Sequence, residues 1–524
     1  MTSTDPTTAA TVVSNEPLAC WQSEAPATGG AIAWEEATAR LGLVEPLTGM
    51  YGHAAAWGDV NGDHRADLVV GTFANRPVDA YQVRGADGPS PDVLLLGGDQ
   101  FQPVPGFSDE LARTSASVFA DLDQDADLDL ILIRNAGGNV TFQRPSSVFE
   151  NRDGQLVHTV DLPVPQEFSG RSVAAADFDG DADLDLLVAE DRFGDSGTRL
   201  LFNEGGFRFV DRTDESGLPP GQFGLGVAIA DLNDDGSPDL FLGGVQQAYL
   251  NRGDGAFEAM DSAVFAWAPN GDEDDVAGIA IADLDRNGWP DIVMGQHFNS
   301  TLNQDRATPV RLFLHQGLDP DGQPKFVEST EESGLLPLPT KAPHVEVTDL
   351  DNDGWPDILT TASADNGDGV AVFRHMGLEN GVPRFEEPTG LGDPQYWVAG
   401  PTADFDRDGL VDVFLVEWEP SLPSRLLRNV SSGGHWLEVS VAGPMTGVGS
   451  SVAVYEAGSI NEPGALIGRQ EIGVGIGYGA GRQPVAHFGL GEVGNVDLLI
   501  QTPDGTSELH DVAADQHLRW PDGC

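Results

Sequence analysis

The stretch DLDNDGWPD, residues 349–357, places carboxylates at its first, third, fifth and ninth positions and a glycine at its sixth. Carboxylates this close repel one another unless a cation lies among them. In a tight loop, alternate side chains converge on one point, the backbone carbonyl of the seventh residue adds an oxygen, and the ninth aspartate can bind through both oxygens. This donor set is typical of Ca²⁺, whereas Mg²⁺ requires strict octahedral geometry. A solvated acidic turn is the alternative for a single copy.

The motif is repeated, which argues against a chance acidic turn. Seven copies begin at Asp59, Asp121, Asp177, Asp231, Asp283, Asp349 and Asp404, and we number the loops in this order. The sequence therefore predicts up to seven Ca²⁺ ions. The expected ligands, with the seventh residue of each loop acting through its backbone carbonyl, are Asp59, Asn61, Asp63, Arg65 and Asp67; Asp121, Asp123, Asp125, Asp127 and Asp129; Asp177, Asp179, Asp181, Asp183 and Asp185; Asp231, Asn233, Asp235, Ser237 and Asp239; Asp283, Asp285, Asn287, Trp289 and Asp291; Asp349, Asp351, Asp353, Trp355 and Asp357; and Asp404, Asp406, Asp408, Leu410 and Asp412.

Ligand charge and turn strain rank these loops. Loops six and seven combine four carboxylates with glycine at the sixth position, so we expect them to bind tightest. Loops four and five each replace one carboxylate by asparagine, and loops two and three have Ala126 and Ala182 at the turn. Loop one has both Asn61 among its ligands and His64 at the turn, so it should empty first.

The elements around the loops read as β-strands. The first aspartates lie 52 to 66 residues apart, a period in the range of propeller blades. Small apolar runs such as GVAIA (226–230) precede the loops, β-rich runs follow them, and a second phrase in each unit reads as two strands joined by a Gly-rich hairpin. Four strands in each of seven units predict an all-β, seven-bladed propeller; a β-solenoid is the weaker alternative.

The last unit lacks the phrase FxxxTxxxGL, which occurs instead as AWEEATARLGL at 33–43. An N-terminal strand around 32–37 is therefore expected to complete the last blade and remove two exposed sheet edges.

At this point the sequence resembles a known family. The seven loops look like FG-GAP/VCBS-type repeats, and HWLEVSVAG, VGSSVAVY, GVGIGYGAG, HFGLG (487–491) and TPDG (502–505) resemble the ASPIC/UnbV domain. Together they resemble a bacterial member of the cartilage acidic protein 1 family. The expected organisation is an N-terminal extension at 1–30, poorly ordered or tethered, a propeller at 31–433, and a β-sandwich-like ASPIC/UnbV-like domain at 434–524.

Charge and composition narrow the partners and the location. The formal net charge of −57 argues against nucleic acid or an anionic membrane as partner, and no run is apolar and long enough for a membrane helix. Weak modular calcium sites fill where calcium is plentiful, which favours an extracellular or periplasmic setting. The first residues of the sequence show neither the charged nor the apolar region typical of a signal peptide, so we expect a signal that has been removed or a start that is not native. We expect a monomer.

Cys20 and Cys524 could pair in an oxidising compartment or remain free thiols.

A possible catalytic pair lies outside the loops. In the strand before each loop, the third and fifth residues before the first aspartate are both polar only in unit six, where they are Glu346 and His344. They share one face of the strand and are expected in the central channel, either as an acid/base or ligand-holding pair or as solvated channel residues. The alternating glycines of GVGIGYGAG (473–481) are expected to allow close packing of strands within the terminal domain.

The sequence thus favours a secreted calcium-binding propeller that acts as a binding, adhesion or matrix-associated module for an unidentified protein, glycan or small molecule. The alternative is a propeller-channel enzyme of secondary metabolism, such as an alkylating enzyme.

Overall fold

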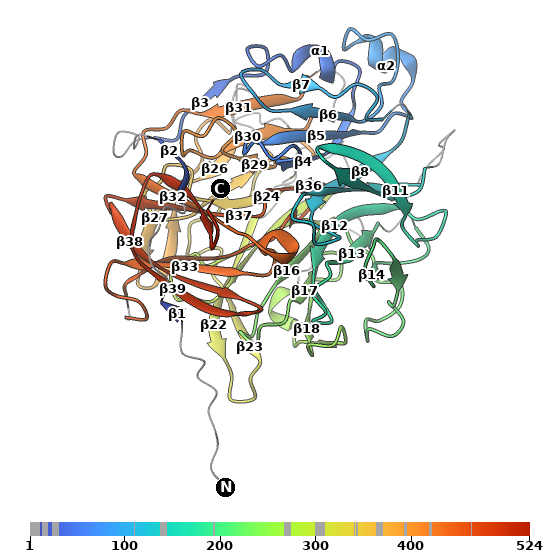
Figure 1. Cartoon of the computed structure of the whole chain (residues 1–524). Helices are drawn as coiled ribbons and strands as arrows, with labels where there is room; N and C mark the ends of the chain where they lie inside the picture. The colour runs from blue at the N-terminus through green and yellow to red at the C-terminus, as the bar shows by residue number, and fades with distance from the viewer. Residues whose placement is uncertain are drawn as a thin grey trace.

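The structure is a computed structural model that describes residues 11–12, 19–23, 31–108, 110–136, 144–191, 194–266, 274–298, 310–339, 341, 344–362, 370–391, 396–418, 422–462 and 464–523. It is an all-β fold (Figure 1). Its helices are short: α1 (Val44–Leu47), α2 (Val78–Gln82), and the 3₁₀ turns η1 (Ala263–Phe265) and η2 (Pro444–Gly447). Among the helices of the described ranges, none has the length and apolar character needed to span a bilayer.

Each aspartate-rich loop joins the first two strands of an antiparallel sheet. Small apolar residues in the first strand and leucine, isoleucine and valine in the second leave these pairs almost entirely buried, as the sequence pattern requires. In chain order the sheets comprise β4 (Gly52–Gly58), β5 (Asp67–Thr72), β6 (Val93–Leu96) and β7 (Gln102–Pro103); β8 (Thr114–Ala120), β9 (Asp129–Arg134), β10 (Ser147–Arg152) and β11 (Gln155–Asp161); β12 (Gly170–Ala176), β13 (Asp185–Glu190), β14 (Arg199–Asn203) and β15 (Phe209–Asp211); β16 (Val227–Ala230), β17 (Asp239–Leu242), β18 (Gln247–Asn251) and β19 (Phe257–Ala259); β20 (Asp274–Ala282), β21 (Asp291–Phe298), β22 (Val310–Leu318) and β23 (Pro324–Glu328); β24 (Val345–Thr348), β25 (Asp357–Thr360) and β26 (Ala371–Phe373), with the separate pair β27 (His375–Glu379) and β28 (Val382–Phe385); and β29 (Thr402–Ala403), β30 (Asp412–Leu415), β31 (Arg425–Asn429) and β3 (Trp34–Glu36).

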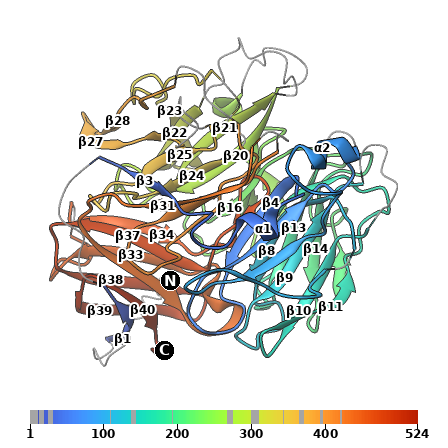
Figure 2. The ribbon, with the colours of Figure 1, turned by 90° about the horizontal axis from the view of Figure 1, so that it is seen from above.

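The N-terminal strand β3 is the outer strand of the last of these sheets. It runs antiparallel to β31, with Trp34 opposite Asn429 and Glu36 opposite Leu427. The first strands lie side by side in the order β4, β8, β12, β16, β20 and β24. Of these, β4, β8, β16, β20 and β24 are labelled near the centre of Figure 2. The first and last sheets also touch, since the Trp57 indole N–H donates to the Pro401 carbonyl over 3.0 Å. The sheets therefore close on one another.

Two further sheets form the C-terminal region, orange to red in Figures 1 and 2. Both recruit an N-terminal strand, so the described parts of the extension are tethered. One sheet has the order β1 (Thr11–Val12), β39 (Gly505–Ala513), β38 (Asn495–Thr502), β33 (Ser451–Glu456) and β34 (Leu466–Glu471); the other has the order β2 (Ala19–Gln22), β40 (Gln516–Trp520), β32 (His435–Val441) and β37 (Val485–Gly491).

One buried apolar cluster joins these two sheets. It contains Leu437 and Phe488 from the second sheet and Val452, Leu498 and Leu509 from the first. Cys20 of β2 takes part in a disulfide, while Cys524, the only other cysteine of the sequence, lies outside the described residues.

The glycine-rich stretch does not pack as the sequence analysis expects. Its short strands β35 (Gly475–Ile476) and β36 (Ala480–Gly481) leave the C-terminal sheets, and β36 pairs in parallel with β4, the first strand of the first sheet. A Cβ at Gly475 would lie 2.4 Å from the Val173 carbonyl oxygen of β12. The prediction of close packing within the terminal domain was therefore wrong. These glycines allow the segment to enter the centre of the ring of sheets and contact its innermost strands.

Candidate metal centres

The ninth aspartate has the same role in all seven loops. In loop six, Asp357 Oδ2 accepts the N–H of Leu350, the second loop residue, over 3.0 Å, and Asp357 Oδ1 accepts the N–H of His375 over 2.8 Å. The equivalent pair of backbone hydrogen bonds is formed by Asp67, Asp129, Asp185, Asp239, Asp291 and Asp412. One oxygen of the ninth aspartate thus binds the loop itself, and the other binds the third strand of the sheet. A metal ion bound at this residue must share an oxygen that already accepts an N–H.

The first aspartate is also wrapped by the backbone. Asp349 Oδ1 accepts the N–H of Asp353 over 3.1 Å, and its Oδ2 accepts that of Gly354 over 2.7 Å. This turn requires a positive φ at the sixth residue, which reaches 94° at Gly354 and 73° at Ala126. The same left-handed conformation occurs at His64 and Ala182. Three loops therefore hold a non-glycine residue in a conformation that favours glycine.

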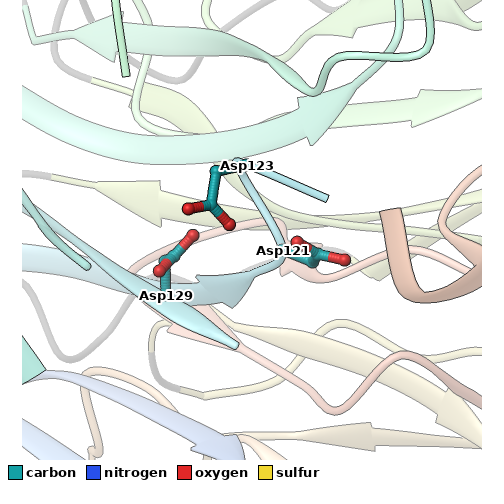
Figure 3. A group of neighbouring side chains, drawn as sticks. All are labelled: Asp121, Asp123 and Asp129. Carbon is teal, nitrogen blue, oxygen red and sulfur yellow. The ribbon is translucent and has the colours of Figure 1, made fainter. Parts of the chain in front are cut away.

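Five loops bring three carboxylates together, with one oxygen from each lying within 4.8 Å of the others. Figure 3 shows the second loop, where the carboxylates of Asp123 and Asp129 face each other and Asp121 lies beside them. The five groups are Asp121, Asp123 and Asp129; Asp177, Asp179 and Asp185; Asp283, Asp285 and Asp291; Asp349, Asp351 and Asp353; and Asp404, Asp406 and Asp412.

Loops one and four form no such group within the described chain, because their third residues are Asn61 and Asn233 rather than aspartates.

In most of the loops that form a carboxylate group, the fifth residue is not a member of it. Its Oδ1 accepts the N–H of the seventh residue, as Asp408 does from Leu410 over 3.0 Å. The same bond is made to the N–H of Arg65, Asp127, Asp183, Ser237, Trp289 and Trp355.

The second loop has oxygens that fit a cation. Oδ1 of Asp121, Asp123 and Asp127 is buried without a hydrogen-bond partner. Burial, followed by neighbouring carboxylates, raises the pKa of Asp127 to about 7; burial also raises the pKa of Asp129 to about 8. Orphaned carboxylate oxygens on three residues of one nine-residue loop suit a hard divalent ion, which would supply the missing partner for each.

Sequence reasoning missed the arginines that contact these loops. Arg374 donates to Asp351 over 2.5 Å and to Asp353 over 2.8 Å, and Arg428 is bonded to Asp406 and Asp408. Arg212 contacts Asp179 over 3.1 Å. Arg374 and Arg428 each directly precede the third-strand residue whose N–H donates to the ninth aspartate, and this position is the signal that could have revealed them.

The C-terminal region contacts the loop face of the sheets. Glu471 Oε2 accepts the N–H of Asp231 over 3.0 Å, and Arg469 donates to Asp234 over 3.0 Å. The two C-terminal sheets therefore rest on the face that carries the aspartate-rich loops. A cavity of about 330 Å³ between this face and the C-terminal sheets is lined by Asp59, Asp404 and Glu438, among others.

His344 and Glu346 lie at the centre of the ring of sheets, where the glycine-rich segment covers them. Their exposures are 0% and 2%. Burial lowers the pKa of His344 to about 4, although hydrogen bonds with the backbone of Tyr478 and Gly400 favour its charged form. Burial raises the pKa of Glu346 to about 7, although Arg482 and the Thr402 hydroxyl favour its charged form. His344 and Glu346 are therefore buried side chains, and the alternative that they are solvated channel residues was wrong.

Comparisons with known proteins define the class. A family described as FG-GAP-like repeat matches residues 121–188, 183–242 and 349–415, and one described as ASPIC and UnbV matches residues 441–523. The chain therefore carries FG-GAP-like repeats followed by an ASPIC/UnbV domain, which confirms the resemblance predicted from the sequence.

Within that class, the chain is homologous to cartilage acidic protein 1. It is 28% identical to the human protein over 375 residues, 66% of this chain and 52% of the relative, and 28% identical to the mouse protein over 377 residues, 67% and 54%. The chain spans about half the length of these curated relatives. Human integrin alpha-7 is 29% identical over 169 residues, 29% of this chain and 13% of the integrin. An exotype rhamnogalacturonan lyase structure has a TM-score of 0.40 at 13% identity, covering 73% of this chain and 72% of that one.

Proposed function

We propose that this chain is a secreted, calcium-binding, seven-bladed propeller that acts as a binding or matrix-associated module. Residues 31–433 form the propeller, closed by β3, and residues 434–524 form an ASPIC/UnbV-like β-sandwich domain that covers the loop face. Up to seven Ca²⁺ ions hold the loops, in an extracellular or periplasmic setting. The observation that carries calcium binding is the set of unpartnered buried oxygens on Asp121, Asp123 and Asp127.

The binding role draws support from homology to a protein named for cartilage and from local similarity to an integrin alpha chain. The competing function, an enzyme working in the propeller channel, loses support because the described glycine-rich segment pairs with β4 and covers His344 and Glu346. A binding surface is therefore to be sought outside the covered centre.

Metal analysis and thermal unfolding test the proposal. We expect the purified chain to retain calcium after dialysis, and EDTA to lower its melting temperature, because empty loops leave carboxylates that repel one another. Added Ca²⁺ should restore the melting temperature, and Mg²⁺ should restore less of it. Asp123→Asn should reduce the calcium content by one ion, whereas Asp153→Asn, in an exposed hairpin, should not. An unchanged melting curve in metal-free buffer, with no calcium retained, would overturn the proposal.

A further inference from the structure

A cluster of arginine and aromatic side chains lies at the end of the first strands that is remote from the aspartate-rich loops. His53 is at the start of β4, whose other end leads into loop one, and Arg113 directly precedes β8, whose other end leads into loop two. The Arg113 cluster, as we name it, draws on four sheets and the glycine-rich segment. It consists of His53, Phe73, Arg113, Arg171, Trp418 and Tyr478.

The imidazole of His53 is a neutral part of this cluster. Its Nδ1–H donates to the Ser115 carbonyl over 3.0 Å, so Nε2 is left to accept hydrogen bonds. Arg171 Nη1 donates to this nitrogen over 2.9 Å, and the Tyr478 hydroxyl, 3.3 Å away, shares the same lone pair. Burial, with the Arg171 charge next, lowers the pKa of His53 well below its ordinary value. The positive charge of the cluster therefore belongs to its arginines.

The two arginines differ in their partners. Arg171 forms an ion pair with Asp191, with Nε 2.6 Å from Oδ2. The Arg113 guanidinium instead lies over the Phe73 ring, 4.3 Å from its centroid, and its Nε is buried without a hydrogen-bond partner. Within the described chain no carboxylate forms an ion pair with Arg113. Burial, followed by the charges of Arg171 and Arg76, lowers its pKa to about 10, and Asp191 opposes this shift only in part. A partly buried guanidinium beside like charges favours an anion.

Aromatic rings lie next to this unmet charge. Trp418 is partly exposed, and its ring centroid lies 5.4 Å from that of Phe73 and 5.6 Å from that of His53. A guanidinium that stacks on a ring by its face keeps its N–H edge available for a carboxylate. Multiply charged anions are disfavoured, because the whole chain has a formal net charge of −57.

We propose that the Arg113 cluster binds a small organic monocarboxylate with an apolar, ring-sized body. The carboxylate accepts two hydrogen bonds from Arg113, and the ring packs against the exposed part of Trp418 that the Arg76 guanidinium, 4.0 Å from its ring centroid, leaves uncovered. The proposal gives a ligand class to the binding module proposed above and rests on that function, but its site lies at the opposite end of the strands from the calcium loops. Failure of one is therefore measured separately from failure of the other.

Calorimetric titration of the calcium-loaded full chain with benzoate tests this site. We expect saturable binding of benzoate, no binding of benzamide, which lacks the charge, and much weaker binding of inorganic phosphate, which lacks the ring. Arg113→Gln should weaken benzoate binding by about tenfold or more, since a charge-assisted hydrogen bond is lost. Arg152→Gln removes the same charge from an exposed side chain of β10 and should leave the affinity unchanged.

A second readout separates a lost contact from a damaged fold. Benzoate should shift the ¹⁵Nε–H resonance of Arg113 in the unaltered chain, because this N–H lacks a partner without ligand. The calcium content and melting temperature of Arg113→Gln should match the unaltered chain. Absence of benzoate binding, equal affinity for benzamide, an unmoved Arg113 resonance, or unchanged affinity in Arg113→Gln would each overturn the proposal, even where calcium binding is intact.

Discussion

The side-chain amide of Asn429 donates a hydrogen bond to the backbone carbonyl of Leu350 over 2.7 Å. This bond joins the third strand of the last sheet to the loop of the preceding sheet, while the Asn429 backbone N–H donates to Asp412 in its own loop. The same link recurs around the structure as Asn151 to Val60, Asn203 to Leu122, Asn251 to Phe178, His315 to Leu232 and His375 to Leu284. Loops one to six are thus each fixed both within their own sheet and to the next one.

Asn429→Ala should lower the free energy of unfolding by about 1–3 kcal/mol, because it leaves the buried Leu350 carbonyl without its partner. Asn429→His should cost less, since histidine makes this link at His315 and His375. Gln102→Ala, at an exposed position of β7, serves as the control. Denaturant unfolding in saturating calcium measures all three. A loss in Asn429→Ala no larger than in Gln102→Ala would show that the link between sheets adds no stability.

The loops could be predicted from the sequence because all their determinants lie within nine residues. The spacing of Asp349, Asp351 and Asp353 alone indicates convergence on one point. The repeated phrases that contain Asn203, Asn251 and His315 can be recognised in the sequence. The backbone carbonyls that accept hydrogen bonds from these three side chains lie in the preceding unit, so the local pattern does not explain why each position is polar. The ninth aspartates show the same limit, since their second hydrogen bond comes from the third strand.

The position of the glycine-rich segment could not be read from the sequence either. Glycine alternation indicates close approach of backbones, but it does not say which backbone approaches. Gly475 meets Val173, Gly477 meets Ile279 and Gly479 meets His53, all about two hundred residues or more earlier in the chain. The same segment explains why unit six could differ from the others at His344 and Glu346, which face it.

Ala126→Gly should stabilise the calcium-loaded protein by about 1 kcal/mol, because φ is 73° at this residue and alanine is strained there. Gly354→Ala should destabilise it by at least about that amount, since φ is 94° and a Cβ would lie 2.9 Å from Arg286 Nη2. Ala39→Gly, at an exposed turn without positive φ, should be mildly destabilising. Thermal unfolding at saturating calcium compares them. If Ala126→Gly behaves like Ala39→Gly, the strain assigned to loop two is absent.

Glu346 should make stability depend on pH. Its pKa is 4.5 in the absence of the fold, and burial raises it to about 7. Between these values the folded chain holds a proton that the unfolded chain lacks, so the contribution is complete below pH 4.5 and is lost as the pH rises to 7. Glu346→Gln keeps the neutral form. The stability of the original chain relative to this variant should therefore fall by up to about 3 kcal/mol over that range.

Denaturant unfolding at several pH values, with calcium saturating throughout, gives this difference directly. Glu258→Gln, at an exposed position of β19, is the matched control and should show no such divergence. Parallel pH profiles for the original chain and Glu346→Gln would mean that the carboxyl stays charged, held by Arg482 and the Thr402 hydroxyl.

The glycine-rich segment leads to the last prediction. Gly475→Ala should destabilise the protein by about 2 kcal/mol or more, because the new Cβ would lie 2.4 Å from the Val173 carbonyl oxygen and 2.7 Å from Ala174 Cα, which are both backbone atoms that cannot turn aside. Gly494→Ala is the matched control, because its Cβ would meet nothing within 4 Å. Hydrogen exchange should show where the effect lies: faster exchange in β4 and β36, whose parallel pairing the segment makes, with little change in β38 and β39. Equal stability of the two variants, or loss of protection confined to the C-terminal sheets, would mean that the segment does not bind the centre of the ring.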